Sequence, residues 1–337
     1  MKALVLEAAS KLVMKEVPIP VPNDNEVLVR TKAATICTSD VNDILYNPFG
    51  IELPMIMGHE GAGIIETVGA NVTEFNVGDE IAAHPVMPCG ECVSCRRGLS
   101  HLCDDMEHLG LNHGGVFAEY FTIRKDRIRK KADNIDFATA SLMEPLCVCI
   151  EAVKRANVEE AQNVLVIGDG PFGILISNIC GGYSNKKTIL LGRHDFRMNH
   201  TKNVITVNEK TCGNVIDEIN RITNGEGIDS AIICAGTSQA MNIAIESLRS
   251  RGTVCVFSAI HEPPAIDLFK VHVKELNICG SCNDMDCLDE SMALLSDGCA
   301  DGIITHKLPF DEYEKAFDIA VNGKDSALKI SLMFGGF

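Results

Sequence analysis

Residues 163–173 read NVLVIGDGPFG, and this stretch decides the architecture of the middle of the chain. Its first five residues form a short, mostly apolar run with the length of a buried strand. The pattern G-x-G-x-x-G follows at once and leads into a helical pattern. Glycines at this spacing permit a tight turn and let a pyrophosphate approach the helix N-terminus; an ordinary glycine turn is the alternative. The expected cofactor-binding residues of the loop are Gly168, Gly170, Pro171, Phe172 and Gly173.

Strand-like and helix-like stretches alternate around this loop, from about residue 146 onward. The expected strands are residues 163–167, 188–191, 230–234 and 253–258, and the expected helices are residues 147–157, 172–181, 215–223 and 238–248. This βαβα order predicts a parallel, doubly wound sheet of the α/β class.

The first 140 residues have a different character, with short β-like runs interrupted by Gly, Pro, Asn and Asp. This pattern favours an antiparallel barrel or sandwich. We expect residues 1–147 to form a first domain, 148–285 a dinucleotide-binding domain, and 286–337 a return to the first domain. The return contains helix-like stretches at 289–296 and 311–321 and a strand-like stretch at 326–333.

The composition excludes several classes of function. The chain has 337 residues, a hydrophobic fraction of 46% and a formal net charge of −16. The negative charge argues against nucleic acid or an anionic membrane as a partner. The N-terminal stretch lacks a signal-peptide core and no apolar run reaches the length of a membrane span, so we expect a cytoplasmic protein. Its 15 cysteines then indicate metal ligands and buried apolar residues, because cytosolic thiols stay reduced.

Four of these cysteines lie in the run CGECVSCRRGLSHLC, with the spacing C-x2-C-x2-C-x7-C. They are Cys89, Cys92, Cys95 and Cys103. Thiolates at this spacing can converge tetrahedrally on Zn²⁺, and four of them leave no open position, which is typical of a structural site. An iron–sulfur cluster is the competing interpretation, because its cysteine spacings overlap with those of zinc.

Three shorter pieces of sequence offer a second donor set. ICTSD supplies a thiol at Cys37, GHEGAG supplies an imidazole at His59 and a carboxylate at Glu60, and MEPLCV supplies a carboxylate at Glu144. A catalytic zinc takes three protein ligands and keeps a fourth position open to water or substrate. Together these residues therefore predict a catalytic metal site, although each alone is a weak signal.

With these motifs in view, the chain resembles the zinc-dependent medium-chain dehydrogenases over essentially its whole length. The matching motifs are CTSD, GHE, a GD pair at 78–79, the four-cysteine run, GGVFAEY at 114–120 and the glycine loop. The resemblance implies a GroES-like β-barrel catalytic domain and a Rossmann cofactor domain. It also implies two zinc ions per chain, a nicotinamide cofactor, a small-molecule alcohol or polyol substrate, and a homodimer or homotetramer.

The resemblance implies roles for the second donor set. Cys37 and His59 bind the catalytic zinc in that family. Glu60 binds the ion in some members and lies nearby in others, and Glu144 occupies a position that holds an acid in the polyol and secondary-alcohol members. The third zinc ligand therefore stays open between Glu60 and Glu144.

Two residues beside Cys37 match further catalytic groups of the family. Ser39 matches the hydroxyl that passes the alcohol proton to the cofactor ribose. Asp40 matches a carboxylate that fixes the tautomer of the histidine ligand. Thr-Ser-Asp is also ordinary turn or helix-cap chemistry, which is the alternative.

The strand after the glycine loop bears on the choice of cofactor. An acid at its end would bind the adenosine ribose of NAD, but here the strand ends in Gly192 and Arg193. A missing carboxylate and an added cation favour a 2′-phosphate, so NADP is preferred over NAD. Asp195 serves NAD instead if the strand runs longer.

We therefore expect a zinc-dependent oxidoreductase that moves a hydride between NAD(P) and a secondary alcohol or polyol, phosphorylated polyols included. An L-threonine 3-dehydrogenase-like enzyme is the alternative: LGLNHGGVFAEY resembles that branch, whereas Glu144-Pro145-Leu146 resembles the polyol branch. A zinc-free reductase of the same fold would not need Cys37, His59 and Glu144 together. A structural or metal-storage protein would not need the glycine loop.

Overall fold

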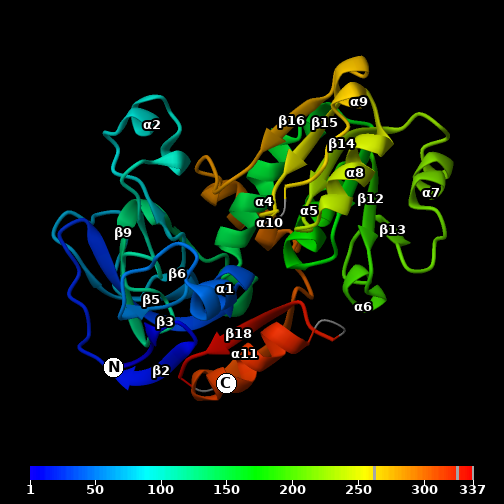
Figure 1. Cartoon of the computed structure of the whole chain (residues 1–337). Helices are drawn as coiled ribbons and strands as arrows, with labels where there is room; N and C mark the ends of the chain where they lie inside the picture. Colours follow the sequence, from blue (N-terminus) through cyan, green and yellow to red (C-terminus); the bar gives the residue numbers. More distant parts are fainter. Residues whose placement is uncertain (261–262, 324–325, 336–337) are drawn as a thin grey trace. The chain divides into compact units, whose positions relative to one another are not determined.

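The computed structural model describes residues 1–260, 263–323 and 326–335. The chain forms two compact units, traced in sequence colours in Figure 1. Met1–Cys147 and Met285–Phe337 make up the first unit, and Val148–Asp284 make up the second. In the described ranges no helix combines the length and the apolar character that crossing a membrane requires.

The first unit is built on a seven-stranded sheet with β3 (Glu26–Ile36) at its centre. One edge of β3 pairs with β5, while the other pairs with β9 along its first half and with β18 along its second half, all antiparallel. The other strands of this sheet are β5 (Glu60–Val68), β6 (Glu80–Ala83), β9 (Tyr120–Arg124), β10 (Ile128–Lys130), β17 (Ile304–Pro309) and β18 (Lys329–Met333). Most of β3 is buried, as expected for a strand covered on both faces.

Two smaller sheets and several helices complete the first unit. The order β2-β1-β4 forms a three-stranded sheet and β7-β8 a two-stranded one. These strands are β1 (Lys2–Ala8), β2 (Lys11–Glu16), β4 (Met55–Ile56), β7 (Val86–Met87) and β8 (Glu107–His108). The α-helices are α1 (Thr38–Tyr46), α2 (Val93–Arg96), α3 (Phe137–Ala140), α10 (Leu288–Ser296) and α11 (Tyr313–Asn322). The apolar core of this unit collects side chains from β1, β3, β5 and β9, among them Leu4, Val29, Ile65 and Phe121.

The second unit is a six-stranded parallel sheet in the order β13-β12-β11-β14-β15-β16. Its strands are β11 (Asn163–Ile167), β12 (Lys187–Gly192), β13 (Ile205–Asn208), β14 (Ile228–Ile233), β15 (Leu248–Val256) and β16 (Asn277–Gly280). Helices α5 (Pro171–Gly181) and α8 (Ser238–Ser247) pack on the sheet, and α6 (Asp195–Met198), α7 (Val215–Ile222) and α9 (Leu268–Val273) complete the unit. The order reverses between β11 and β14, which is the switch point where doubly wound sheets bind nucleotides. Helix α4 (Met143–Arg155) carries the chain from the first unit into the second.

The sequence predicts the central strands of both units well but misses several strands at the edges of the sheets. The expected antiparallel β domain and the expected parallel, doubly wound sheet are both present. The sequence pattern does not predict β2, β13, β16 and β17, whose residues are largely exposed or intermediate in burial. Edge strands of this kind lack the continuous apolar run that marks a buried strand. The segment Thr38–Asp40, for which turn or cap chemistry was the alternative interpretation, forms the first turn of the helix α1.

Candidate active site, cysteine lobe and nucleotide pocket

The central sheet of the first unit brings the predicted catalytic ligands to one edge. Strand β3 ends directly before Cys37, and the antiparallel strand β5 begins at Glu60, which pairs in register with Thr35. His59 therefore lies beside the end of β3. The ligand atoms of Cys37, His59 and Glu60 lie within 4.8 Å of one another, and all three residues are buried.

Asp40 connects two members of this cluster. Its Oδ1 lies 2.9 Å from Nδ1 of His59, and its Oδ2 accepts a hydrogen bond of 2.8 Å from the backbone N–H of Cys37. The helix α1 presents Asp40 in its first turn, where a carboxylate is favoured by the helix dipole. With Nδ1 directed at the Asp40 carboxylate, Nε2 is the ring nitrogen of His59 that a metal would take.

The acidic side of the site carries unsatisfied oxygens. Glu60 forms an ion pair with the buried Lys329 at the start of β18. Its second oxygen, Oε2, is buried without a hydrogen-bond partner in the described residues, and the same holds for Oε2 of Glu144. Glu144 lies outside the 4.8 Å cluster, but burial and the nearby Glu60 charge raise its pKa to about 7. Within the described part of the chain, each of these two buried carboxylates has one unpaired oxygen. Buried charges are normally paired, so the two free oxygens are suited to a cation.

The raised pKa values of the buried Lys329 and His59 indicate the same negative environment. Burial alone would lower the pKa of Lys329. The nearby Glu60 and Cys37 raise this pKa by more than burial lowers it, so the net shift is upward. The pKa of His59 is also raised well above its ordinary value, because Asp40 and Cys37 outweigh the opposing effect of burial. A thiolate, an imidazole and a carboxylate in such a pocket suit Zn²⁺. The donor set and the orphaned oxygens therefore fit the predicted metal.

Two side chains flank His59. The hydroxyl of Ser39 lies 3.5 Å from Nε2, at the limit of a hydrogen bond. The ring of His108 lies 5.7 Å from that of His59, centroid to centroid. Burial, reinforced by the charge of His59, lowers the pKa of His108 to about 3, so this ring is neutral at pH 7. The sequence missed both His108 and Lys329; an isolated lysine in the apolar stretch ALKISLM was the available signal for the latter.

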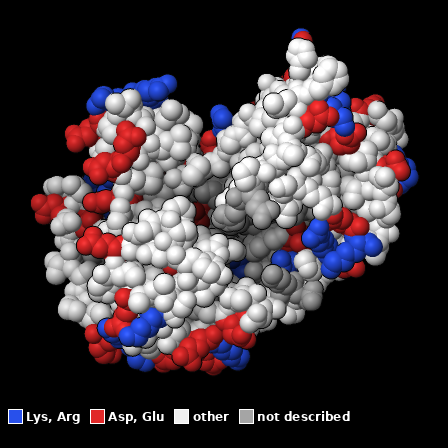
Figure 2. Space-filling model, in the orientation of Figure 1, with Lys and Arg blue, Asp and Glu red and all other residues white. Residues whose placement is uncertain are grey.

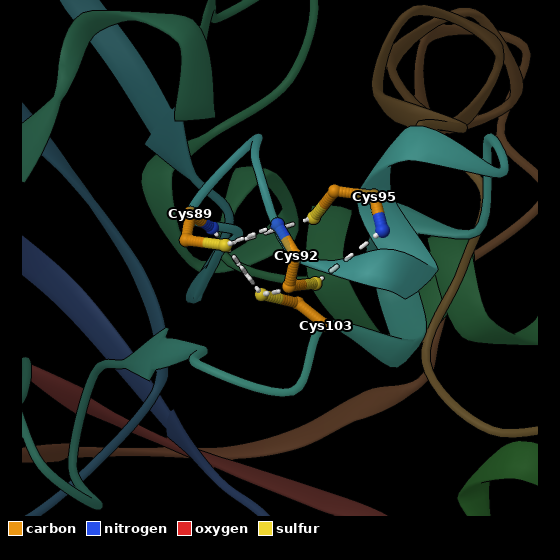
Figure 3. A group of neighbouring side chains, drawn as sticks. All are labelled: Cys89, Cys92, Cys95 and Cys103. Carbon is orange, nitrogen blue, oxygen red and sulfur yellow. Dashed lines mark hydrogen bonds between the residues drawn. The ribbon is translucent and has the colours of Figure 1, made fainter.

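The four cysteines of the predicted structural site lie together in a lobe formed by residues 88–108 (hereafter the cysteine lobe). Figure 3 shows the four side chains converging from a loop and the short helix α2. The sulfur–sulfur distances are 3.4 Å for Cys89–Cys103, 3.8 Å for Cys92–Cys103 and 4.0 Å for Cys89–Cys95. A tetrahedral zinc with Zn–S bonds of ~2.3 Å places its sulfurs about 3.8 Å apart.

Backbone N–H groups surround these sulfurs. Cys92 donates to the Cys89 sulfur at 3.3 Å, and both Cys95 and Asp104 donate to the Cys92 sulfur at 3.4 Å. Cys89 donates to the Cys103 sulfur at 3.3 Å. Such donors stabilise thiolates, the form in which cysteine binds metal. The cysteine lobe thus fits a closed four-thiolate site.

In the second unit, the glycine loop lies between β11 and α5, as predicted. Gly170 is the N-cap of α5 and Pro171 its first residue, and no side chain among the described residues caps this helix end. A Cβ on Gly173 would lie 1.8 Å from the carbonyl oxygen of Gly168, so only glycine permits this close approach of loop and helix. A Cβ on Gly170 would meet nothing within 4 Å, which leaves open space before the helix N-terminus. This cradle fits a pyrophosphate.

The end of β12 holds the residues expected to read the adenosine end of the cofactor. Gly192 is its last residue, and Arg193 forms an ion pair with Glu209, with 2.7 Å between Nε and Oε2. Asp169, from the glycine loop, accepts hydrogen bonds of 2.6 Å from the backbone N–H groups of Arg193 and His194. Asp195 begins the short helix α6 beyond the strand. The sequence did not identify Asp169 or Glu209, because their proximity to Arg193 depends on the sheet order.

Charged side chains elsewhere are mostly acidic, in line with the net charge of the chain. Figure 2 shows Asp and Glu more widely spread than Lys and Arg over the visible face. Several basic side chains of the chain are paired with acids, for example Lys2 with Asp311 and Lys130 with Asp79. An extended basic surface for nucleic acid is therefore not seen on this face in the described residues.

The chain is similar to known proteins over nearly its whole length. Residues 23–133 match the family described as "Alcohol dehydrogenase GroES-like domain", and residues 189–297 match "Zinc-binding dehydrogenase". The chain is 31% identical to L-threonine 3-dehydrogenase of Bacillus subtilis, over 96% of each chain. It is 29% identical to sorbitol dehydrogenase of Bombyx mori, over 97% of each chain. An alcohol dehydrogenase of Escherichia coli CFT073, crystallised with NADH, superposes with a TM-score of 0.90 at 26% identity, over 99% of each chain.

Proposed function

Because the chain belongs to the medium-chain zinc-dependent alcohol dehydrogenase family, we propose that it oxidises a secondary alcohol or polyol with NADP, and reduces the corresponding ketone. The enzyme class, a zinc-dependent NAD(P) dehydrogenase of the polyol or threonine type, follows from the relatives. The substrate, the preference for NADP and the individual site residues are the parts we propose.

The observation that carries the proposal is the buried cluster of Cys37, His59 and Glu60 with Asp40 behind it. We propose that Cys37, His59 and Glu60 hold the catalytic zinc. Lys329 occupies one oxygen of Glu60 and leaves Oε2 for the metal. Glu144 is the neighbouring acid of the same site. Zinc bound there would supply a Lewis acid that stabilises negative charge on the substrate oxygen during hydride transfer.

The protein groups around this cluster position ligands and move a proton. Asp40 holds the His59 ring in one tautomer and orientation through Nδ1. Ser39, with its hydroxyl near Nε2 of His59, is the group we assign to take the proton from the substrate hydroxyl. Neutral His108 adds a half-buried ring beside His59 without adding a competing positive charge.

The second zinc would be structural. Cys89, Cys92, Cys95 and Cys103 would hold it, and four thiolates leave no position for a substrate. We assign the glycine loop, with Gly168, Gly170, Pro171, Phe172 and Gly173, to the cofactor pyrophosphate, because the open N-terminus of α5 favours an anion.

Gly192 and Arg193 support the preference for NADP. Arg193 provides a guanidinium directly after β12. The last residue of β12 is Gly192, which has no carboxylate to bind the ribose diol. We also propose that the enzyme is a homodimer or homotetramer. Among the described residues, β16 pairs with β15 on one side only and has an exposed Ile278, so this edge is available to another chain.

A substrate panel tests the proposal. Purified enzyme is assayed with sorbitol, xylitol, a polyol phosphate, a simple secondary alcohol and L-threonine, each with NAD and with NADP. We expect the highest kcat/KM for a polyol or secondary alcohol, and loss of turnover in His59→Ala with an unchanged circular dichroism spectrum. Preference for L-threonine would establish the alternative, which the similarity to L-threonine 3-dehydrogenase of Bacillus subtilis supports. A fully active His59→Ala enzyme would overturn the assigned site.

A further inference from the structure

We propose that Glu209 sets the selectivity between NADP and NAD by holding the Arg193 guanidinium away from a 2′-phosphate. This inference rests on the proposed function, since it concerns how the same cofactor pocket reads the adenosine end. Its basis is a network of residues from four separate segments of the second unit.

The first part of the network is the ion pair itself. Arg193 Nε lies 2.7 Å from Glu209 Oε2, and Gln239 Nε2 donates to Glu209 Oε1 at 2.9 Å. Both oxygens of Glu209 are therefore engaged. The Glu209 side chain is only 19% exposed, whereas that of Arg193 is 50% exposed. The hydrogen bond from Gln239 on α8 thus holds the Glu209 carboxylate in place, whereas the Arg193 guanidinium remains partly open to solvent.

The second part is the backbone of Arg193. Asp169 accepts from the N–H groups of Arg193 and His194 at 2.6 Å each, and its carboxylate lies 3.0 Å from the ring Nδ1 of His194. A Cβ on Gly192 would lie 2.7 Å from the Cβ of Asp169. Glycine at the strand end therefore makes room for Asp169, which in turn fixes the direction in which Arg193 leaves the strand.

These groups surround one small cavity of about 100 Å³, lined among others by Gly168, Asp169, Gly192, Arg193 and Glu209. The pocket contains two carboxylates and one guanidinium, and the guanidinium is already paired. A 2′-phosphate that binds here must compete with Glu209 for Arg193, and it is also repelled by the nearby negative charge of Glu209. A ribose diol is neutral, so it neither competes for Arg193 nor is repelled by Glu209. Glu209 therefore moderates the preference for NADP that Arg193 alone would give.

Binding of the adenosine half alone tests this without turnover. Calorimetry measures the Kd of 2′,5′-ADP, which carries the 2′-phosphate, and of 5′-ADP, which lacks it. For the native enzyme we expect the two values to lie within about tenfold of each other. In Glu209→Gln we expect 2′,5′-ADP to bind about tenfold more tightly, with 5′-ADP changed less than twofold. Adding Arg193→Gln to that variant should abolish the gain.

Glu218→Gln is the matched control, because Glu218 also pairs with an arginine, Arg221, at 2.7 Å, outside the residues that line the cavity. It should change neither Kd. Glu209→Ala serves as a second variant if Glu209→Gln does not fold. An unchanged Kd for 2′,5′-ADP, or a gain that persists without Arg193, would overturn the proposal. Weaker binding of 5′-ADP would also overturn it, because Glu209 would then contact the ribose. Failure of the native enzyme to bind either nucleotide would contradict the proposed cofactor itself.

Discussion

Replacing Asp40 by Asn probes how the protein positions two metal ligands with one carboxylate. One oxygen of Asp40 faces His59 Nδ1 at 2.9 Å and the other accepts from the Cys37 N–H at 2.8 Å. Asparagine offers one acceptor oxygen and one group that only donates. Its side chain can therefore satisfy either His59 or Cys37, and its NH₂ group then faces the N–H of the other. The residue is 1% exposed, so water cannot easily replace the lost bond.

The size of the effect follows from this geometry. Groups that orient metal ligands typically contribute 10–100-fold in metal affinity, or about 1.4–2.7 kcal/mol. Leaving one buried N–H unpaired costs about 1–3 kcal/mol, which is the same range. The substitution also places the asparagine NH₂ group against a second N–H donor. We therefore expect Asp40→Asn to weaken catalytic zinc binding by about 30–100-fold, and kcat/KM to fall at least as much at limiting zinc.

Chelator competition with metal analysis measures this loss. At a chelator concentration that leaves the native enzyme fully loaded, Asp40→Asn should keep only the zinc of the cysteine lobe. Asp43→Asn is the control, because Asp43 is a buried carboxylate on the same helix whose Oδ1 has no hydrogen-bond partner in the described residues. It should retain both ions. If Asp40→Asn held its catalytic zinc within threefold of the native affinity, the positioning role of Asp40 would be wrong.

Three further outcomes are expected. Burial and the charge of Asp40 raise the pKa of Asp43 to about 6, above the unfolded value of 3.8, so the ionised group destabilises the folded state. Asp43→Asn should therefore stabilise the protein by about 1–3 kcal/mol at pH 8, and urea titrations should show this gain vanishing as the pH falls below about 4. Cys103→Ser should reduce the zinc content from about two ions to about one per chain and expose the cysteine lobe to proteases, whereas normal zinc content would contradict the four-thiolate site. Gly173→Ala would force a Cβ to 1.8 Å from the Gly168 oxygen, so binding of 5′-ADP should weaken at least ~tenfold by calorimetry; unchanged affinity would remove the loop from the cofactor site.

The parts of the site that the sequence predicted are those in which local spacing determines geometry. The glycine loop and the cysteine lobe each lie within a short stretch, so the distances among Cys89, Cys92, Cys95 and Cys103 depend on few torsion angles. Cys37 and His59 were identified from separate motifs, and the antiparallel pairing of β3 with β5 is what brings them together. The sequence contains these motifs but not the register that joins them.

The residues that the sequence missed reach the site from distant strands. Lys329 meets Glu60 because β18 pairs with β3, across a separation of 269 positions along the chain. Glu209 meets Arg193 because β13 lies beside β12 in the parallel sheet. A charged residue in an exposed or short strand gives no periodic signal of its partner, so such pairs become visible only with the fold.

The most direct test of the catalytic site is an anomalous difference map from crystals of the native enzyme, recorded just above the zinc absorption edge. We predict two peaks per chain: one within the cysteine lobe, and one about 2.0–2.3 Å from Cys37 Sγ, His59 Nε2 and a carboxylate oxygen of Glu60. A peak in the cysteine lobe with none among Cys37, His59 and Glu60, in enzyme that turns over its substrate, would contradict the account.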